Sequence, residues 1–503
     1  MAVLYHSTRE NSHSLSAKQA ILQGIAPDGG LYVLDSLNKK TLNLSHICKQ
    51  NFKETVFDVL SSLLDDYTSE ELKNCIDGAY GSQWDTPVIT PVSTIGDDWL
   101  LELFHGPTSA FKDVALQMLP RLMSVARTSA EIKETSASEK NIMIVTATSG
   151  DTGKAALEGF KDIPGMGIVV FYPEGKVSDI QRMQMVTQKG SNVIVCAVKG
   201  NFDDAQNAAK AIFTNTELRQ KLALKHTVLS SANSINIGRL VPQITYYFDT
   251  YAQLVQKGSI TPGKKITFCV PTGNFGDILA GYLAKQMGLP VEKLIIASNS
   301  NNVLTDFLKT GTYNRNRVFK KTISPSMDIL VSSNLERLLY LASSGDVELI
   351  SHLMEQLKTK GTYTVPKQTM DVIKENFDAG YATDKQTQET IKFTWENYGV
   401  LIDPHTAVAQ YVLNETSHHV DDVRVCLSTA SPYKFSSDVL YALGHSTHEL
   451  DDFACMQTLA DITDTVPPIQ LKSLNDNAII HTDTREKDQL TSYVFEACNR
   501  IFA

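Results

Sequence analysis

The chain has 503 residues, more than one hydrophobic core usually absorbs, so several domains or two large ones are expected. Hydrophobic residues make up 42% and charged residues 20% of the chain, a globular balance that argues against disorder or a fibre. The net charge of −10 argues against a nucleic-acid scaffold, which is normally basic, but allows a local basic pocket for an anionic metabolite.

The N-terminal stretch MAVLYHSTRENSHSL has neither the basic segment nor the apolar run of a signal peptide. We see no apolar run of about 18 residues, so no membrane span is expected. The seven cysteines form no C-x-x-C pair, and several sit in apolar runs such as NVIVCAV. We therefore expect free buried thiols and a cytoplasmic protein.

Residues 1–95 predict a mixed α/β domain, with the helical pattern SAKQAILQG, the turn and strand APDGGLYVLD, and the amphipathic NFKETVFDVLSSLLDDY. Around residue 97 the strand pattern DDWLLELFHG leads into HGPTSAFKDVALQMLPRLM, a loop followed by a helix. Lys112 lies in the first turn of that helix, beside Phe111 and a run of core residues. Burial should lower the pKa of this lysine, and a neutral amine can attack an aldehyde. A surface lysine whose charge reaches solvent is the alternative.

From residue 141 onward, short apolar runs alternate with helical patterns, which predicts parallel sheets covered by helices on both faces. The predicted strands are 141–148, 167–173, 192–198, 265–271, 293–298 and 423–429. The predicted domains are an N-terminal mixed domain (1–95), catalytic α/β lobes (96–304 and 396–450), a mainly helical insertion (305–395), and a C-terminal tail and helix (451–503).

Ligands of open parallel sheets bind at the carboxyl ends of strands, so the strand-to-helix turns are the places to examine. TATSGDTGKAA (146–156) offers hydroxyls and glycines before a helix start, which favours an anion, although an ordinary capped helix start remains the alternative. It is not a nucleotide P-loop, because Thr148 replaces the first glycine and Ala155 the magnesium-binding hydroxyl. CVPTGNFGDILAGY (269–282) suits a phosphate, unless Asp277 is only a helix cap.

In CLSTASPYKF (426–435), Thr429 follows a strand, a weak indication by itself because hydroxyls often cap turns. Together the features form a set: an amine for an aldehyde, a turn for its phosphate, a hydroxyl for its ring nitrogen, and a turn for a substrate carboxylate. This set is typical of a pyridoxal-phosphate site.

With these motifs the chain resembles the threonine synthases of the longer bacterial and fungal type, within the fold-type-II (tryptophan synthase β-like) pyridoxal-phosphate enzymes. The combination of HGPTSAFKD, SGDTG and GNFGDILAGY is highly specific. The matching segments span almost the whole chain: LQGIAPDGGLYV (22–33), LELFHGPTSAFKDVALQ (101–117), TATSGDTGKAA (146–156), SSANSINIGRLVPQITYYF (230–248), PTGNFGDILAGYLAKQMGLP (271–290), GVLIDPHTAVA (399–409) and LSTASPYKF (427–435).

The resemblance implies an α/β fold with two open, mainly parallel sheets. It implies that Lys112 forms the Schiff base with pyridoxal 5'-phosphate and moves protons, and that Thr429 lies beside the pyridine nitrogen. The implied cofactor loop comprises Gly273, Asn274, Phe275, Gly276 and Asp277. Ser431 departs from the histidine common in this family, which puts local packing in doubt more than reaction type.

The implied reaction is O-phospho-L-homoserine plus water giving L-threonine and phosphate, by β,γ-elimination and replacement. No metal-ligand spacing is seen, so no metal is expected. We expect a monomer or homodimer that binds this small substrate and neither nucleic acid nor membrane. For the substrate carboxylate we choose Thr148, Ser149, Asp151 and Thr152, and for its phosphate Arg239 with Asn233 and Asn236, Lys154 being a weaker candidate.

Several of these assignments have alternatives. Asp151 would repel a carboxylate, so it orients the loop or contacts the cofactor hydroxyl instead; Arg239 is otherwise a structural salt bridge, and His105 either shuttles protons or shapes its loop. Alternative functions are another fold-type-II activity, such as a serine or threonine dehydratase or cysteine synthase, and a threonine synthase-like phospho-lyase. A metabolite sensor and a cofactor-free phosphate-binding protein are more distant alternatives.

Overall fold

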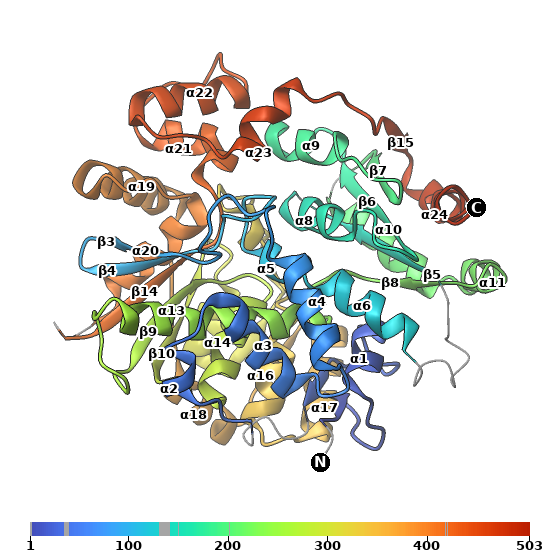
Figure 1. Ribbon diagram of the computed structural model, residues 1–503, viewed down its shortest axis with the longest axis horizontal. Helices are drawn as coiled ribbons and strands as arrows, with labels where there is room; N and C mark the ends of the chain where they lie inside the picture. Colours follow the sequence, from blue (N-terminus) through green and yellow to red (C-terminus); the bar gives the residue numbers. More distant parts are fainter. Residues whose placement is uncertain are drawn as a thin grey trace.

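Two mainly parallel β-sheets organise the chain, as the alternating pattern predicted (Figure 1). The computed structural model describes residues 3–34, 40–129, 141–148, 150–200, 202–417, 419 and 421–503. The larger sheet has six strands in the order β13-β10-β9-β14-β4-β3, all parallel except for β3, which runs antiparallel to β4. Its strands are β3 (Val92–Ile95), β4 (Asp98–Glu102), β9 (Ile266–Pro271), β10 (Val291–Ser298), β13 (Phe377–Tyr381) and β14 (Val423–Ser428).

The smaller sheet has five parallel strands in the order β15-β7-β6-β5-β8. Alternate residues of β5 serve opposite faces: Ile142 and Ile144 join the main core, whereas Met143 and Val145 join a second core under α10, α11 and α24. The strands are β5 (Asn141–Ala147), β6 (Met166–Pro173), β7 (Val193–Val198), β8 (Thr227–Ser230) and β15 (Asp483–Arg485). The helices of this lobe are α8 (Asp151–Phe160), α9 (Asp179–Val186), α10 (Phe202–Thr214), α11 (Thr216–Ala223) and α24 (Leu490–Ile501).

Helices cover the larger sheet and link it to the smaller one. Helix α20 packs on β9, β14, β10 and β13, whereas α13 packs on α14, and α14 lies against β10 and β9. These helices are α13 (Ile244–Gln256), α14 (Gly276–Gln286), α19 (Asp384–Tyr398) and α20 (Pro404–Glu415). The linking helices are α5 (Lys112–Leu116), α6 (Leu119–Thr128) and α12 (Ile237–Leu240).

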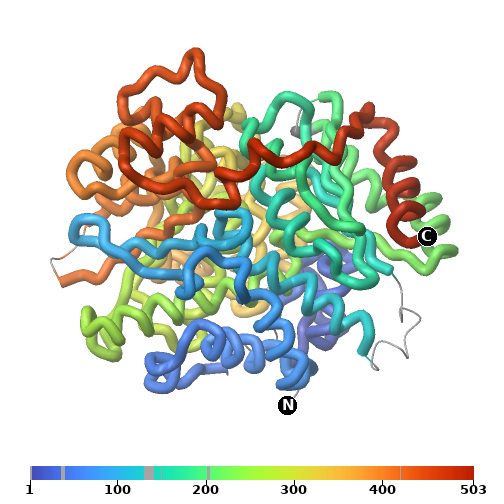
Figure 2. Tube along the Cα trace, turned by 45° about the horizontal axis from the view of Figure 1, so that its top comes forward, coloured from blue at the N-terminus to red at the C-terminus, as the bar shows by residue number. Residues whose placement is uncertain are grey.

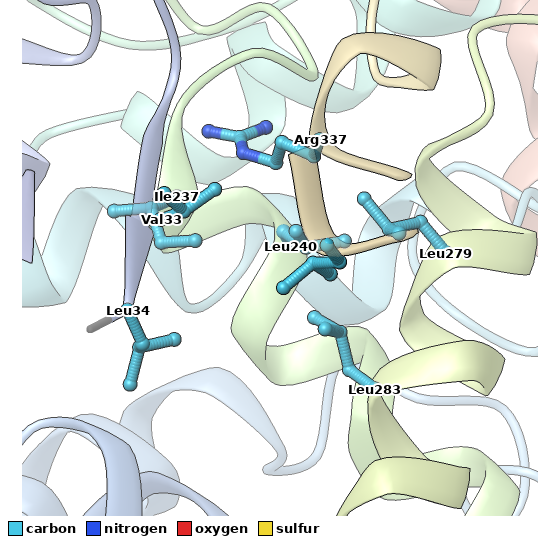
Figure 3. Close-up of a pocket in the computed structure, with 8 residues that line it drawn as sticks. Val33, Leu34, Ile237, Leu240, Leu279, Leu283 and Arg337 are labelled. Atoms are coloured by element: carbon cyan, nitrogen blue, oxygen red, sulfur yellow. The ribbon is translucent and has the colours of Figure 1, made fainter. Parts of the chain in front are cut away.

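The N-terminal region packs on α12, α14 and the helix α16 (Leu335–Ala342), as Figure 3 shows. Val33 and Leu34 face Ile237 and Leu279 across a small apolar pocket, and the guanidinium of Arg337 donates to the backbone oxygen of Tyr32 at 2.9 Å. The elements of this region are β1 (Tyr5–Ser7), paired with β2 (Tyr32–Leu34), and the helices α1 (Ala17–Gln23), α2 (Leu44–Ile47), α3 (Phe52–Leu63) and α4 (Ser69–Ala79).

Residues 305–395, expected as a mainly helical insertion, also supply the edge strand β13 of the larger sheet. The remaining elements here are α15 (Val303–Thr310), β11 (Thr312–Asn314), α16 (Leu335–Ala342), α17 (Val347–Lys360), β12 (Thr362–Thr364) and α18 (Lys367–Asn376), with a short 3₁₀ turn at Pro325–Met327. β11 and β12 form their own two-stranded antiparallel sheet.

The C-terminal segment runs across the molecule from the larger to the smaller lobe (Figure 2). It forms α21 (Ser436–Ala442), α22 (Asp452–Thr463) and α23 (Ile469–Lys472), preceded by a 3₁₀ turn at Pro432–Phe435 and followed by further ones at Ser473–Asp476 and Lys487–Gln489. Between the last two turns it adds β15 to the edge of the smaller sheet, next to β7, and after them it covers that sheet with α24. The expected tail therefore completes the smaller lobe.

All seven cysteines are free and buried, as expected. Within the described ranges, no helix combines the length and apolar character that crossing a membrane requires.

Helices α5 and α8 touch through their backbones at Gly159. A methyl group added there would lie 1.9 Å from the carbonyl oxygen of Leu116, at the end of the helix that begins with Lys112. Only glycine allows this approach, so the sequence at position 159 sets how closely the lysine-bearing helix packs on the smaller lobe.

We predict that Gly159→Ala lowers the free energy of unfolding by roughly 1–3 kcal/mol, because overpacking forces backbone shifts. Gly78→Ala is the matched control, since the atoms nearest to its new methyl belong to the flexible side chain of Arg121. Urea unfolding of both variants checks this, and an unchanged midpoint for Gly159→Ala would contradict the close-packing argument.

Candidate active site

Loops that follow β4, β5, β9 and β14 meet at one place, where these strands end. The amide of Phe111, after β4, donates to the carbonyl of Thr429, after β14, at 2.8 Å. The Lys112 amine lies 3.8 Å from the carboxylate of Asp151, which opens the helix after β5. Parallel strands put their carboxyl ends at one edge of a sheet, so the topology itself gathers these residues.

The loop before Lys112 is fixed by its own contacts. Asp113 accepts hydrogen bonds from the backbone amide of Thr108 at 2.8 Å and from its hydroxyl at 2.6 Å. Ser109 adopts the left-handed region (φ 57°), and its carbonyl accepts from the amide of Ser431 at 3.1 Å. The loop is therefore joined to the segment after β14, and Lys112 begins its helix in a defined position.

The Lys112 amine sits in a nearly closed polar pocket. The residue is 8% exposed, and its Nζ lies 4.6 Å from the centre of the Phe111 ring. Nζ donates to the hydroxyl of Ser326 at 3.4 Å. Burial lowers the pKa of Lys112 to about 8; Asp151 opposes this shift, whereas the charges of Lys434 and Arg239 reinforce it. A substantial neutral fraction near neutral pH follows, as a base or nucleophile requires.

Asp151 is a shared partner of two lysines. Its Oδ1 accepts from Lys434 at 2.8 Å and from the amide of Gln181 at 2.9 Å, and its Oδ2 faces Lys112. Burial alone would raise the pKa of Asp151, but Lys434, followed by Lys112, holds it below its ordinary range. The carboxylate is thus ionised and committed to cations, and it is not available to receive a substrate carboxylate.

The turn from β9 into α14 forms a cradle for an anion. Phe275 takes the left-handed conformation (φ 63°), and the carbonyls of Gly273 and Asn274 accept from Ser332 at 2.7 Å and Asn334 at 3.1 Å. Within the described part of the chain, the amides of Gly273, Asn274 and Phe275 donate to no protein group. A methyl at Gly273 would meet the backbone oxygen of Ser326 at 2.7 Å. Free amides before an 11-residue helix suit a phosphate.

Asp277 supports this helix start from behind. Its Oδ1 accepts from the phenols of Tyr246 and Tyr247, at 2.5 and 3.0 Å, and burial raises its pKa to about 6. No side-chain cap bond forms at the start of α14, so the cap alternative does not hold. Asp277 joins α14 to α13, and Gly276 begins α14 beside Asn334.

These residues fit pyridoxal phosphate. The buried amine of Lys112 suits its aldehyde, and the turn at 273–275 suits its phosphate. The Oδ2 of Asp277 is buried without a partner among the described residues, as in a site shaped for a further group. Thr429, 5% exposed, follows β14 where a hydroxyl can meet a ring nitrogen. The contacts therefore agree with a pyridoxal-phosphate site. The role of each residue in that site stays a prediction.

Two residues expected to bind substrate have structural contacts instead. The Thr148 hydroxyl accepts from the amides of Gly150 at 3.0 Å and Gly153 at 2.9 Å, which organises the start of α8. The fully buried Asn236 caps α12 through the amide of Gly238 at 2.9 Å and donates to the carbonyl of Ile21 at 2.9 Å. Neither pattern was visible in the sequence, because each depends on a neighbour's backbone.

Other expected ligands remain available. Thr152 is half-buried in the first turn of α8, and Asn233 is exposed with its side-chain oxygen 3.3 Å from the Thr146 hydroxyl. Ser149 lies outside the described residues. Arg239 is 3% exposed; its Nη1 donates to the carbonyl of Ala232 at 2.9 Å, while its Nε has no partner among the described groups. Its contacts are not those of a structural salt bridge.

Lys154 and His105 lie away from the reactive amine. Lys154 pairs with Glu158 at 3.0 Å and lines a separate cavity of about 390 Å³, which Lys112 does not border. The two ring nitrogens of His105 contact Asp85 and Glu102, each at 2.8 Å. Burial lowers the pKa of His105, but these two hydrogen bonds outweigh it and raise the pKa to about 9. His105 therefore shapes its loop.

Sequence reasoning did not assign Ser326, Lys434, His405 or Asp403. Lys434 is fully buried and donates to the carbonyl of Thr108 at 2.8 Å as well as to Asp151. Ser326 lies in a loop between β11 and α16, with no chemical pattern around it. Lys434 and His405 stand inside quoted motifs, LSTASPYKF and GVLIDPHTAVA, but only the fold shows what they contact. Among the described residues, no cluster of His, Cys, Asp and Glu could hold a metal ion.

Comparisons with known proteins agree with this geometry. The family described as pyridoxal-phosphate dependent enzyme matches residues 89–429, and the threonine synthase N terminus family matches residues 4–80. Threonine synthase of Saccharomyces cerevisiae is 38% identical, over 87% of this chain and 91% of its own. Human threonine synthase-like 1 is 37% identical, over 84% of this chain and 58% of its own. The crystal structure of a PLP-bound threonine synthase from Brucella melitensis superposes with a TM-score of 0.86, at 34% identity and 99% coverage of both chains.

The pairing of Asp151 with two lysines predicts how substitutions should change the pKa of Lys112. Asp151→Asn should lower the pKa of Lys112 below about 8, because it removes the opposing carboxylate and leaves Lys434 uncompensated. Lys434→Met should raise the pKa of Lys112, because a like charge disappears. The pH dependence of Lys112 acetylation in the apoprotein, followed by mass spectrometry, measures both, with Lys154→Met as control. Shifts in the same direction would contradict the arrangement.

Proposed function

The chain belongs to the threonine synthase family of fold-type-II pyridoxal-phosphate-dependent enzymes, and on that premise we propose that it converts O-phospho-L-homoserine and water to L-threonine and phosphate. It is a pyridoxal-phosphate-dependent lyase by family, and the substrate and the role of each residue are our proposal.

The proposal rests mainly on a second candidate group for binding an anion, Arg239, in addition to the free amides at 273–275. The cofactor carries its own phosphate, for which the free amides of Gly273, Asn274 and Phe275 are suited. O-phosphohomoserine brings another phosphate, and this needs a separate cation. Arg239 meets that need: it is buried, its Nε is unpaired among the described residues, and its charge acts on Lys112. A guanidinium can give a phosphate two parallel hydrogen bonds.

Lys112 is the residue to which we assign proton transfer. When bound, pyridoxal phosphate supplies a conjugated electron-withdrawing system that makes protons on the substrate carbons removable. The Lys112 amine then takes the α-proton and a β-proton of the substrate and returns protons, tasks that need a neutral amine near the working pH. Asp151 and Ser326 hold the amine on one side of the pocket. Thr429 would offer the ring nitrogen of the bound cofactor a hydroxyl and not a carboxylate, so this side chain would not stabilise a positive charge on that nitrogen.

For the substrate carboxylate we assign the first turn of α8, with Thr152. Ser149, which precedes Gly150 in the sequence, stays a candidate from the sequence alone. Asp151 is the first residue of this turn, and its carboxylate is paired with Lys112 and Lys434. Because these lysines neutralise Asp151, the N-terminus of α8 can still stabilise the substrate carboxylate.

We also propose that the protein works in the cytoplasm as a monomer or homodimer, without nucleic acid. Seven free, buried thiols suit a reducing compartment, and a net charge of −10 disfavours nucleic acid.

The direct test mixes the holoenzyme with O-phospho-L-homoserine and measures phosphate and threonine. Phosphate and threonine should appear in equal amounts. Lys112→Ala should lower turnover by a factor of at least about 100, because proton transfer loses its base. Phosphate without threonine would identify a phospho-lyase instead. Turnover of serine or threonine, with none of the phosphate ester, would indicate a dehydratase.

Arg239→Gln should raise the KM for O-phosphohomoserine about 10- to 100-fold, the value of a charged hydrogen bond, while cofactor content stays unchanged. Lys154→Gln is the control, because its side chain lines the separate cavity. Equal losses of cofactor and substrate binding in Arg239→Gln would mean that Arg239 serves the cofactor phosphate.

A further inference from the structure

Ser326 stands between the reactive amine and its counter-ion. Its hydroxyl accepts from Lys112 Nζ at 3.4 Å and donates to Oδ2 of Asp151 at 3.4 Å. The residue reaches this place from a loop that is distant in sequence from both partners and lies over Gly273. The Ser326 hydroxyl thus contacts both the amine and the carboxylate, while the backbone oxygen of the same residue lies close to Gly273.

The Ser326 hydroxyl can donate its hydrogen to only one of its two partners, Asp151 and Lys112. Asp151 is ionised and can only accept, so the hydroxyl hydrogen points to Asp151. Towards Lys112, Ser326 therefore presents a lone pair, which accepts one N–H of the amine. With that N–H fixed, the lone pair of a neutral amine faces away from Ser326.

A buried histidine holds Ser326 by its backbone. The amide of Ser326 donates to Nε2 of His405 at 3.1 Å. On the other side of the ring, Nδ1 lies 2.7 Å from Oδ1 of Asp403. A carboxylate can only accept, so Nδ1 carries the hydrogen and Nε2 is left as an acceptor. His405 is 2% exposed, Asp403 is fully buried, and the ring of Phe435 packs edge-on against the imidazole at 4.9 Å.

The rest of the loop is held elsewhere. Asn299 donates to the hydroxyl of Ser324 at 3.0 Å and to its carbonyl at 3.3 Å, which fixes the loop two residues before Ser326. For the Ser326 amide itself, His405 is the acceptor. His405 therefore fixes the backbone position of Ser326, the residue of this loop that contacts Lys112.

We propose that Asp403 and His405 are positioning residues for the Lys112 amine. They fix the tautomer that accepts from the Ser326 amide, and Ser326 in turn orients the amine for proton transfer. The inference rests on the proposed function only in taking Lys112 as the base, and it adds three residues to which sequence reasoning gave no role.

Two replacements of His405 separate positioning from packing. Glutamine places a carbonyl oxygen near the position of Nε2 and can still accept from the Ser326 amide, whereas asparagine is too short to reach it. Ser326→Ala removes the hydroxyl directly. Ser324→Ala is the matched control, because it removes an equally small hydroxyl from the same loop without touching Lys112.

Three measurements are made on each variant: the pH midpoint of Lys112 acetylation in the apoprotein, kcat and KM of the holoenzyme, and Tm. Ser326→Ala and His405→Asn should lower the acetylation midpoint, because the charged amine loses an acceptor, and should lower kcat about 10-fold or more with KM within about twofold. His405→Gln and Ser324→Ala should keep the wild-type midpoint.

A lower Tm in His405→Asn with an unchanged acetylation midpoint would overturn the proposal, as would equal behaviour of the Asn and Gln variants. Failure of the proposed function looks different: the unmodified holoenzyme would then release no threonine from O-phospho-L-homoserine, whatever the acetylation midpoints of the variants. Each result therefore bears on one of the two claims.

Discussion

The pairing of Asp151 with Lys112 and Lys434 is the constraint on which the site depends. All three side chains are nearly or fully buried, and buried charges are tolerated only when they are paired and hydrogen-bonded. The carboxylate comes from the smaller lobe, whereas the lysines come from loops after β4 and β14 of the larger sheet. The ion pairs thus join the two lobes at the proposed active site, and displacement of one loop would leave a charge without its partner.

Backbone contacts keep the loops in the positions that this pairing needs. The lysine loop is joined to the segment after β14 through Phe111 and Ser431, so Lys112 and Lys434 keep a fixed separation. Gly159 lets the lysine-bearing helix lie against α8, which begins with Asp151. In the turn from β9 into α14, Ser332 and Asn334 donate hydrogen bonds to the carbonyls of residues 273 and 274. The amides of this turn stay free to bind an anion. Side chains do the chemistry, but main-chain hydrogen bonds set the distances.

The sequence predicted what depends on local pattern. The apolar runs predicted β5, β6, β7, β9, β10 and β14 to within two residues at each end, because buried parallel strands need continuous apolar residues. It also predicted a lysine in the first turn of a buried helix. Thr148 and Asn236 were expected to bind substrate because a free hydroxyl or side-chain amide and one that organises a helix start look identical in a sequence. Ser326 and His405 were missed because their contacts with Lys112 and with each other cross 214 and 79 residues of chain.

Two buried lysines share one carboxylate, and their geometry distinguishes them. Lys434 lies 2.8 Å from Asp151 and Lys112 lies 3.8 Å from it. At an effective dielectric constant of about 20, these distances correspond to attractions of about 6 and about 4 kcal/mol. Lys434 also donates a short hydrogen bond to the carbonyl of Thr108, whereas the hydrogen bond from Lys112 to Ser326 is long, at 3.4 Å. The Lys434 ammonium favours the neutral form of Lys112. The cation beside the amine thus supports the role of base that we assign to Lys112.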